Sequence, residues 1–291
     1  MKTISALFIV ASLALLSFRS DKPAYMLYDA EGRKVRYDKM IQAISTADVV
    51  FFGELHDNPI AHWLEYEVTA DLYKVAGDRL VQGAEMFEAD NQLLLDEYLS
   101  AAYEADKFEA EVKLWKNYKT DYKPLVEFAK KNNLPFIATN VPRRYASVVS
   151  KKGLEALEQL PEEARNYIAP LPIFYDPEVK SYKDMMEMGG MPGMGGKPNE
   201  NFPKAQAIKD ATMAYFILKN LEPGKIFIHY NGSYHSDNYL GIIYYLKRER
   251  PDIKVATITT VLQADTASLS AEYKGTADYL VVIPETMTRT Y

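Results

Sequence analysis

The chain of 291 residues contains no cysteine, only four histidines and only two tryptophans. The lack of cysteine excludes disulfides, thiolate zinc sites and a lipid anchor attached to an N-terminal cysteine. The net charge of −6 gives no general attraction to nucleic acid or to an anionic membrane, so we expect no nucleic-acid partner. With 48% hydrophobic residues, the composition is that of an ordinary globular protein that depends on its core for stability.

Residues 1–20 have the pattern of an export signal. Lys2 supplies the positive start, residues 4–16 are apolar apart from small serines, and Ser17 and Ser20 lie near plausible cleavage points. The stretch is shorter than the roughly 20 apolar residues that span a bilayer, which favours a signal peptide over an N-terminal anchor. We therefore predict export to the periplasm or cell envelope, soluble or N-terminally anchored, with residues 21–291 as a single domain.

Strand-like and helix-like segments alternate along the chain. Apolar, β-branched and aromatic runs predict strands at 48–53, 80–86, 134–140, 225–231, 254–262 and 278–284. Apolar residues at helical spacing predict helices at 60–76, 90–102, 122–132, 204–220 and 238–249. Residues 25–28 and 35–37, on either side of a turn, predict a hairpin. The alternation predicts a three-layer α/β/α fold around a mainly parallel, mixed sheet.

The middle of the chain, residues 143–200, has a different composition. Residues 143–169 predict short helices with charged faces. Residues 185–199 contain five of the 11 methionines and five of the 14 glycines, which predicts an irregular loop. We interpret the segment as a helical and loop insertion, whose methionines serve either as an adaptable apolar lid or in no special role.

All four histidines lie in two similar segments. The first is Gly53-Glu54-Leu55-His56 followed by His62, and the second is His229 followed by Gly232-Ser233-Tyr234-His235. Each Gly-x-x-His step follows a predicted strand, where glycine allows a sharp turn and a close approach of the backbone. Asn58 and Pro59 are suited to begin the next helix, as cap and first residue. The repetition favours a site over an incidental histidine in a turn.

Glu54 and Glu85 add carboxylates at predicted strand ends, where ligands of parallel sheets bind. One interpretation is a Zn²⁺, Mn²⁺ or Fe²⁺ site with His56, His235 and Glu54 as ligands. The other is metal-free general acid and base catalysis by Glu54, His56, Glu85 and His235. His229, within an apolar strand, is interpreted as a core residue, and His62 as a residue at the entrance of the site.

Several segments resemble the ChaN-like haem-binding uptake proteins, which share a superfamily with Tiki proteins, TraB-like proteins and erythromycin esterases. The resemblance rests on GELHDN, GAEMF, TNVPRRYASVVSKKGLEAL, AQAIKDATMA and NGSYHSDN, and it extends from about Asp48 to the last strand. It implies an exported haem-binding protein with a tyrosine as iron ligand and a homodimer around stacked haems. The Tiki relatives instead imply a metal-dependent peptidase site at His56, His235 and Glu54 or Glu85.

For haem, the candidate ligands are Tyr175 and Tyr182, with Met185 and Met186 covering a porphyrin face. The expected partners are haem, a second copy of the chain and an outer-membrane haem or iron receptor. Three hypotheses result. The chain is an exported haem-binding protein of haem or iron acquisition, a metal-dependent peptidase or esterase, or an exported α/β protein whose histidines are only structural.

Overall fold

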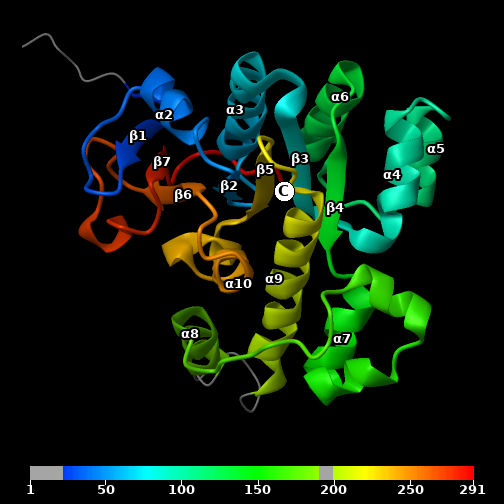
Figure 1. Ribbon diagram of the computed structural model, residues 1–291. Coiled ribbons are helices and arrows are strands. Elements are labelled where there is room, and N and C mark those ends of the chain that lie inside the picture. The colour runs from blue at the N-terminus through cyan, green and yellow to red at the C-terminus, as the bar shows by residue number, and fades with distance from the viewer. Residues whose placement is uncertain (1–21, 190–198) are drawn as a thin grey trace, which may run out of the picture.

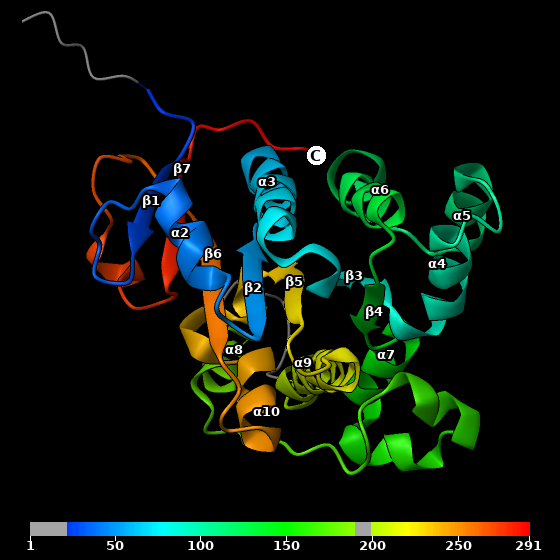
Figure 2. The same cartoon turned by 45° about the horizontal axis from the view of Figure 1, so that its top comes forward.

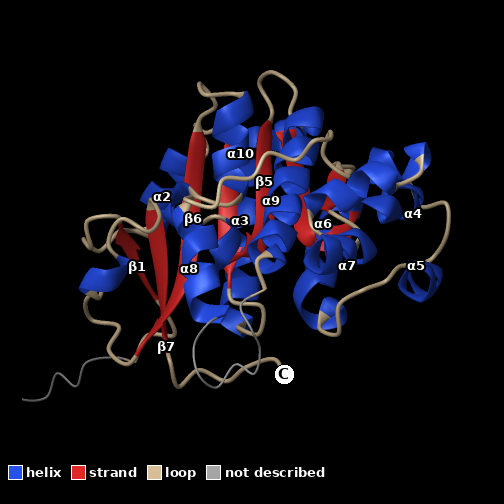
Figure 3. Ribbon diagram, turned by 90° about the horizontal axis from the view of Figure 1, so that it is seen from below, coloured by secondary structure: helices blue, strands red, loops and turns tan. Residues whose placement is uncertain are grey.

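A seven-stranded mixed sheet forms the centre of the computed structural model, which describes residues 22–189 and 199–291 (Figure 1). The strand order is β1-β7-β6-β2-β5-β3-β4. All neighbouring strands are parallel except β1, which pairs antiparallel with β7 at one edge (Figure 3). The strands are β1 (Met26–Asp29), β2 (Val49–Glu54), β3 (Leu80–Glu88), β4 (Phe136–Asn140), β5 (Ile226–Gly232), β6 (Val255–Gln263) and β7 (Tyr279–Pro284).

Helices cover both faces of the sheet (Figure 2). On one side lie α2 (Tyr37–Ile44), α3 (Pro59–Ala76), α4 (Gln92–Leu99), α5 (Ala105–Glu111) and α6 (Lys123–Asn132). On the other lie α7 (Arg143–Lys152), α8 (Lys180–Gly189), α9 (Asn201–Asn220) and α10 (Ile242–Glu249). The predicted three-layer α/β/α fold is therefore confirmed.

The alternation of side chains along β2 explains why the sheet is buried on both faces. Val50 and Phe52 pack into the core beneath α2, α3 and α6, whereas Val49 and Phe51 pack into the core beneath α9 and α10. All four side chains are fully buried. Such a continuous apolar run is typical of an internal parallel strand with helices on either side.

Six of the predicted strands and all five predicted helices are present, but the predicted hairpin and the predicted start of one helix are wrong. The expected hairpin is reduced to a single bridge between Tyr28 and Lys34, because β1 pairs with β7 instead. The helix expected from residue 238 begins only at Ile242, since Asn238 and Gly241 adopt positive φ angles of 58° and 56°. The predicted start of α3 is confirmed: the Asn58 side chain accepts hydrogen bonds from two backbone N–H groups of its first turn.

The segment expected to be an insertion folds onto the α9 side of the sheet. It contains α7, two short 3₁₀ turns (Leu154–Gln159 and Glu162–Tyr167) and α8. Residues 185–189, expected to be irregular, instead complete α8. The rest of the Met/Gly-rich stretch, 190–198, lies outside the described residues, as does the predicted signal peptide, 1–20. Within the described residues, no helix is both long enough and apolar enough to cross a membrane.

Candidate functional site

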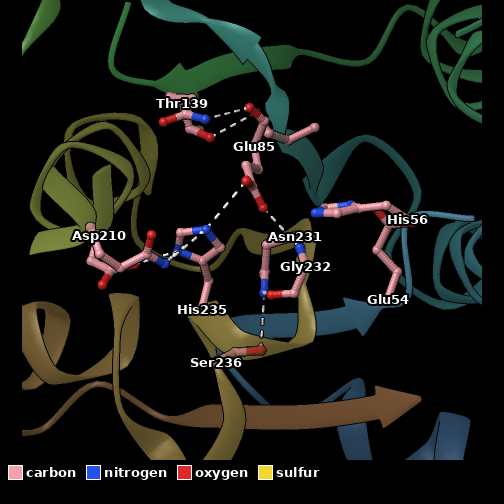
Figure 4. Close-up of polar contacts among 12 residues, drawn as sticks. Glu54, His56, Glu85, Thr139, Asp210, Asn231, Gly232, His235 and Ser236 are labelled. Carbon is pink, nitrogen blue, oxygen red and sulfur yellow. Dashed lines mark hydrogen bonds and ion pairs between the residues drawn. The ribbon is translucent and has the colours of Figure 1, made fainter. Parts of the chain in front are cut away.

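The carboxyl ends of β2, β5 and β3, which are adjacent in the sheet, bring the two Gly-x-x-His steps together. Glu54 is opposite Gly232 in the register of β2 and β5, so that both steps leave the sheet at the same level. Figure 4 shows His56, Glu85 and His235 converging there. All three line a cavity of about 500 Å³, while Glu54 lies behind His56 and is buried.

The two motif glycines allow each step to approach the other. A Cβ atom on Gly53 would lie 3.0 Å from the Cα atom of Ser233 in the second step. A Cβ atom on Gly232 would lie 2.8 Å from Nε2 of His56 in the first step. A larger residue at either position would therefore clash with the other step. This close packing explains why both motifs begin with glycine.

His56 and Glu54 form an oriented histidine–carboxylate pair. The Nδ1 atom of His56 lies 2.6 Å from Oε1 of Glu54, which also accepts a hydrogen bond from the hydroxyl of Tyr122. The Nε2 end of the ring is directed towards Gly232 and Glu85 (Figure 4). Burial disfavours the charged ring, but the bond to Glu54 and the charge of Glu85 outweigh it and raise the pKa of His56. The pair can therefore hold and move a proton at Nε2.

His235 lies between two carboxylates. Its Nε2 atom is 3.2 Å from Glu85, and its Nδ1 atom bonds Asp210 of α9. Glu85 also accepts the backbone N–H of Gly232, and Asp210 accepts the hydroxyl of Tyr182. Burial opposes charge on the ring, but Glu85 and Asp210 raise the pKa of His235 to about 10, so that the ring is a cation at neutral pH.

Aromatic and basic side chains line the rest of the 500 Å³ cavity. Trp115 contacts the His56 ring edge-on, with ring centroids 4.8 Å apart, and Phe202 of α9 is half exposed at the cavity wall. Arg143 and Lys209 supply positive charge. The cavity thus combines apolar surface, two cations and two histidine–carboxylate groups, a composition suited to an organic anion.

A second polar centre lies on the other side of Glu54. The Nδ1 atom of His62 is 2.9 Å from Oε2 of Glu54 and 3.1 Å from Oε2 of Glu65, and its Nε2 atom is 3.3 Å from Asp121. All four side chains are buried. Burial opposes charge on His62, but the bonds to Glu54 and Glu65 raise the pKa of His62 to about 11, while burial and the charge of Glu54 raise the pKa of Glu65 to about 8.

The structure separates the residues that the sequence suggested as one metal site. His56 pairs with Glu54, and His235 pairs with Glu85 and Asp210. Within residues 22–189 and 199–291, the one group of three whose ligand atoms all lie within 4.8 Å of one another is Glu54, His62 and Glu65. Of the expected metal ligands, only Glu54 belongs to it.

His229 is a core residue, as predicted. Its Nε2 atom bonds the hydroxyl of Thr139 and its Nδ1 atom bonds the side chain of Asn231. Burial lowers the pKa of His229 to about 4, so that the ring is neutral at physiological pH. The bond to Thr139 links β5 to β4 across the intervening strand β3.

The sequence reasoning missed Glu65, Asp121, Asp210 and Trp115. Glu65 follows His62 by three residues on α3, a spacing that places both on one helix face and that could have been noticed. Asp210 is a lone acidic residue within the apolar face of α9, which is also a usable signal. Trp115 lies in an irregular segment and Asp121 in the short π-helix Tyr118–Tyr122 that follows it, and only the tertiary structure brings them to the site.

The candidate haem ligands differ in the accessibility of their hydroxyl groups. Tyr182 is 1% exposed and donates its hydrogen bond to Asp210, and burial raises its pKa far above the ordinary value. Tyr175 is partly buried, with its ring 5.6 Å from that of Tyr182, and no hydrogen bond among the described residues engages its hydroxyl. Met185 is buried in the core and Met186 is partly exposed, both on α8.

Phe174, next to Tyr175, marks an apolar surface between the segment before α8 and helices α9 and α10. It is 40% exposed, and the guanidinium of Arg248 lies 3.5 Å from the centre of its ring. A cavity of about 280 Å³ opens beside it, lined by Phe174, Tyr215, Tyr245 and Arg248 among others. The surface therefore offers an aromatic face, a cation and a neighbouring phenol.

The fold and the paired strand-end motifs define an α/β/α protein with a polar site at the carboxyl ends of its parallel strands. The chain belongs to the family of haem-binding uptake proteins of the Tiki superfamily, ChaN, whose model matches residues 40–246. This confirms the family resemblance seen in the sequence. No curated protein matches the chain.

Three solved structures are similar to the chain at low sequence identity, and the first of them shares its fold. A structure of cofacial haem binding to ChaN of Campylobacter jejuni is 15% identical, with a TM-score of 0.66, over 89% of this chain and 96% of that chain. The type III effector HopBA1 is 13% identical, with a TM-score of 0.48, over 88% of this chain and 98% of that chain. A Bacillus cereus protein is 12% identical, with a TM-score of 0.46, over 84% and 90% of the two chains.

Proposed function

We propose that this chain binds haem and acts in haem or iron acquisition. The observation that carries the proposal is the match of the haem-binding uptake family over residues 40–246, which includes the first Gly-x-x-His step, Glu85 and the second step. The fold shared with the haem-binding ChaN of Campylobacter jejuni over nearly its whole length supports it. In this proposal, the chain takes up iron in the form of haem.

We assign the haem to the surface around Phe174, with Tyr175 as the iron ligand. A porphyrin needs an apolar face, a cation for its propionates and an axial ligand. Arg248 contacts the Phe174 ring, and Tyr175 is the next residue along the chain. Tyr182, the other tyrosine suggested by the sequence, is the poorer ligand because its hydroxyl is buried against Asp210, and Met186 is the better placed of the two methionines to cover a ring.

The remaining features of the proposal concern location and partners. The apolar N-terminal segment supports export to the periplasm or envelope, where an outer-membrane haem or iron receptor would be the source of haem. The cofacial arrangement named for the Campylobacter jejuni protein supports a homodimer around stacked haems. Fractionation of cells that produce the full chain tests export. Sedimentation with and without haemin tests the formation of the homodimer.

The haem proposal is tested by titrating the purified chain with haemin and recording the Soret band. We expect a shifted band that saturates at a fixed haemin-to-chain ratio, with no saturation for a size-matched α/β protein without the family motifs. A linear, non-saturating increase would contradict haem binding.

A second function, hydrolysis of an ester or amide, is favoured by the His56–Glu54 pair at the 500 Å³ cavity. Glu54 orients the ring, and His56 can take a proton from water at Nε2 as the water attacks a carbonyl group, then return it to the leaving group. Arg143 and Lys209 would hold an anionic part of such a substrate. The metal-dependent form, with Zn²⁺, Mn²⁺ or Fe²⁺ on His56, His235 and Glu54, requires His235 to leave its two carboxylates.

The hydrolase proposal is tested with a panel of esters and peptides, with and without added divalent metal. We expect any activity to fall by about a hundredfold in His56→Gln, within the usual range for loss of a general base. Glu88→Gln, which changes a carboxylate of the same cavity outside the histidine pairs, is the control. Absence of turnover with every substrate and metal, or equal activity of both variants, would contradict it.

A further inference from the structure

Three buried carboxylates surround the His62 ring. Glu54 and Glu65 face its Nδ1 atom at 2.9 and 3.1 Å, and Asp121 faces its Nε2 atom at 3.3 Å. Among the residues that the structure describes, no lysine or arginine nitrogen lies within 4 Å of these carboxylates. Buried charges require compensation, and the three carboxylates have only two imidazole rings, that of His62 and that of His56 on the other oxygen of Glu54.

The hydrogen-bond partners of His62 leave room for a cation. The Nε2 atom faces two acceptors, the carbonyl oxygen of His56 at 3.2 Å and Asp121, so Nε2 carries a hydrogen. The Nδ1 atom also faces only carboxylate oxygens, so that either a second proton or a metal ion must lie between them. The Oε1 atom of Glu65 has no hydrogen-bond partner although the side chain is fully buried, which is costly in a site without a further cation.

We propose that Glu54, His62 and Glu65 bind a divalent transition-metal ion such as Zn²⁺. One nitrogen and two carboxylate oxygens are ligands of Zn²⁺, Mn²⁺ and Fe²⁺. Tetrahedral zinc with bonds of about 2.0–2.1 Å holds its ligand atoms roughly 3.3 Å apart, close to the 2.9 and 3.1 Å from Nδ1 to the two carboxylates. The carbonyl oxygen of His56 accepts the hydrogen of Nε2 and so directs Nδ1 towards the ion, and Asp121, 3.3 Å from Nε2, acts as a positioning residue for the same ring.

The site borders a second cavity and is connected to the cavity of His56. His62 and Asp121 line the second cavity, of about 600 Å³, together with Trp63 and Tyr66 of α3, whereas Glu54 and Glu65 lie behind the His62 ring. Glu54 binds the ion through Oε2 while Oε1 stays on His56. Occupancy of the metal site would therefore alter the charge on the carboxylate that orients His56.

The test uses the haem-free full chain, freed of metal with a chelator and then titrated with Zn²⁺ alone. We expect one tightly bound ion per chain and a rise in the melting temperature that the chelator reverses. Glu65→Gln keeps the shape of the side chain but removes a ligand, and should weaken Zn²⁺ binding by roughly a hundredfold or more. Glu67→Gln, on the same helix but outside the cluster, is the matched control and should bind as the unchanged chain does.

The outcomes separate a metal site from a cluster held by protons alone. In a proton-only cluster, the raised pKa of Glu65, about 8, keeps its carboxyl group neutral at pH 7, so Glu65→Gln leaves the melting temperature nearly unchanged, with no difference in Zn²⁺ binding. That result, or binding of no Zn²⁺ by the unchanged chain, would overturn the proposal. If Glu65→Gln does not fold, Asp121→Asn takes its place, with an expected loss of at least about tenfold in affinity.

Discussion

The Oε1 atom of Glu54 lies 2.6 Å from Nδ1 of His56, at the point where β2 leaves the sheet. The other oxygen of the same carboxylate lies 2.9 Å from His62. Glu54 therefore joins two histidine centres that face different cavities, one of about 500 Å³ and one of about 600 Å³. A single buried carboxylate thus connects the first Gly-x-x-His motif to both cavities.

Replacing Gly232 by alanine should displace the His56 ring. The new Cβ atom would lie 2.8 Å from Nε2, and the ring is the more movable partner. Since the ring would then lose its bond to Glu54, we expect the raised pKa of His56 to fall towards 6.5. An NMR titration of the histidine rings measures this, with His229 on the same strand as internal control. An unchanged pKa of His56 would show that the ring does not depend on the space that Gly232 leaves.

Replacing Asn58 by alanine should destabilise the chain by about 1 kcal/mol, the usual cost of a lost helix cap. The side chain of Asn58 accepts two backbone hydrogen bonds at the start of α3, the helix that carries His62 and Glu65. Urea unfolding measures the change. Asn58→Ser, which retains a capping oxygen, should recover most of the stability, and equal losses in both variants would argue against a capping role.

His229 should make the chain less stable as the pH falls from about 6.5 to 4. Its folded pKa is lowered to about 4, so that the unfolded chain takes up a proton in this interval and the folded chain does not. The associated loss in the free energy of unfolding is on the order of 3 kcal/mol. His229→Gln cannot take up that proton, so its unfolding free energy should fall less steeply between pH 7 and pH 4. Parallel curves for the two chains would contradict the prediction.

Haem binding should strengthen with rising pH. Burial and the charge of Asp176 raise the pKa of Tyr175, so the phenol is protonated at neutral pH and must lose its proton to ligate iron. For release of one proton, affinity rises by about tenfold per pH unit. Haemin affinities measured between pH 6 and pH 9 test this, and the dependence should be lost in Tyr175→Phe. A pH-independent affinity of the unchanged chain would exclude a tyrosinate ligand.

Much of the fold was predictable from sequence because local patterns agree with it. The buried run of β2 and the helical spacing of α3 are strong signals, and Asn58 marks their junction. The start of α10 was not predictable, because Asn238 looks like a helix cap while its backbone adopts a left-handed turn. The pairing of β1 with β7 depends on the two ends of the chain, which no local pattern reveals.

The site was predictable only in part, for a similar reason. The repeated Gly-x-x-His steps begin in the last residues of the buried strands β2 and β5, and Glu85 lies within the last part of β3. The partners of these residues come from far along the chain: Asp210 reaches His235 from α9, and Asp121 reaches His62 from the short π-helix Tyr118–Tyr122. Which carboxylate belongs to which histidine is decided by packing rather than by spacing.

The most direct test of haem binding at Tyr175 is the absorption spectrum of the haemin complex in Tyr175→Phe and Tyr182→Phe. We predict that Tyr175→Phe loses or shifts the Soret and charge-transfer bands of a tyrosinate-ligated ferric haem. Tyr182→Phe should retain them, because the hydroxyl of Tyr182 is bound to Asp210. Bands that survive in Tyr175→Phe and disappear in Tyr182→Phe would contradict the assignment, and a chain that binds no haemin at all would contradict the proposed function.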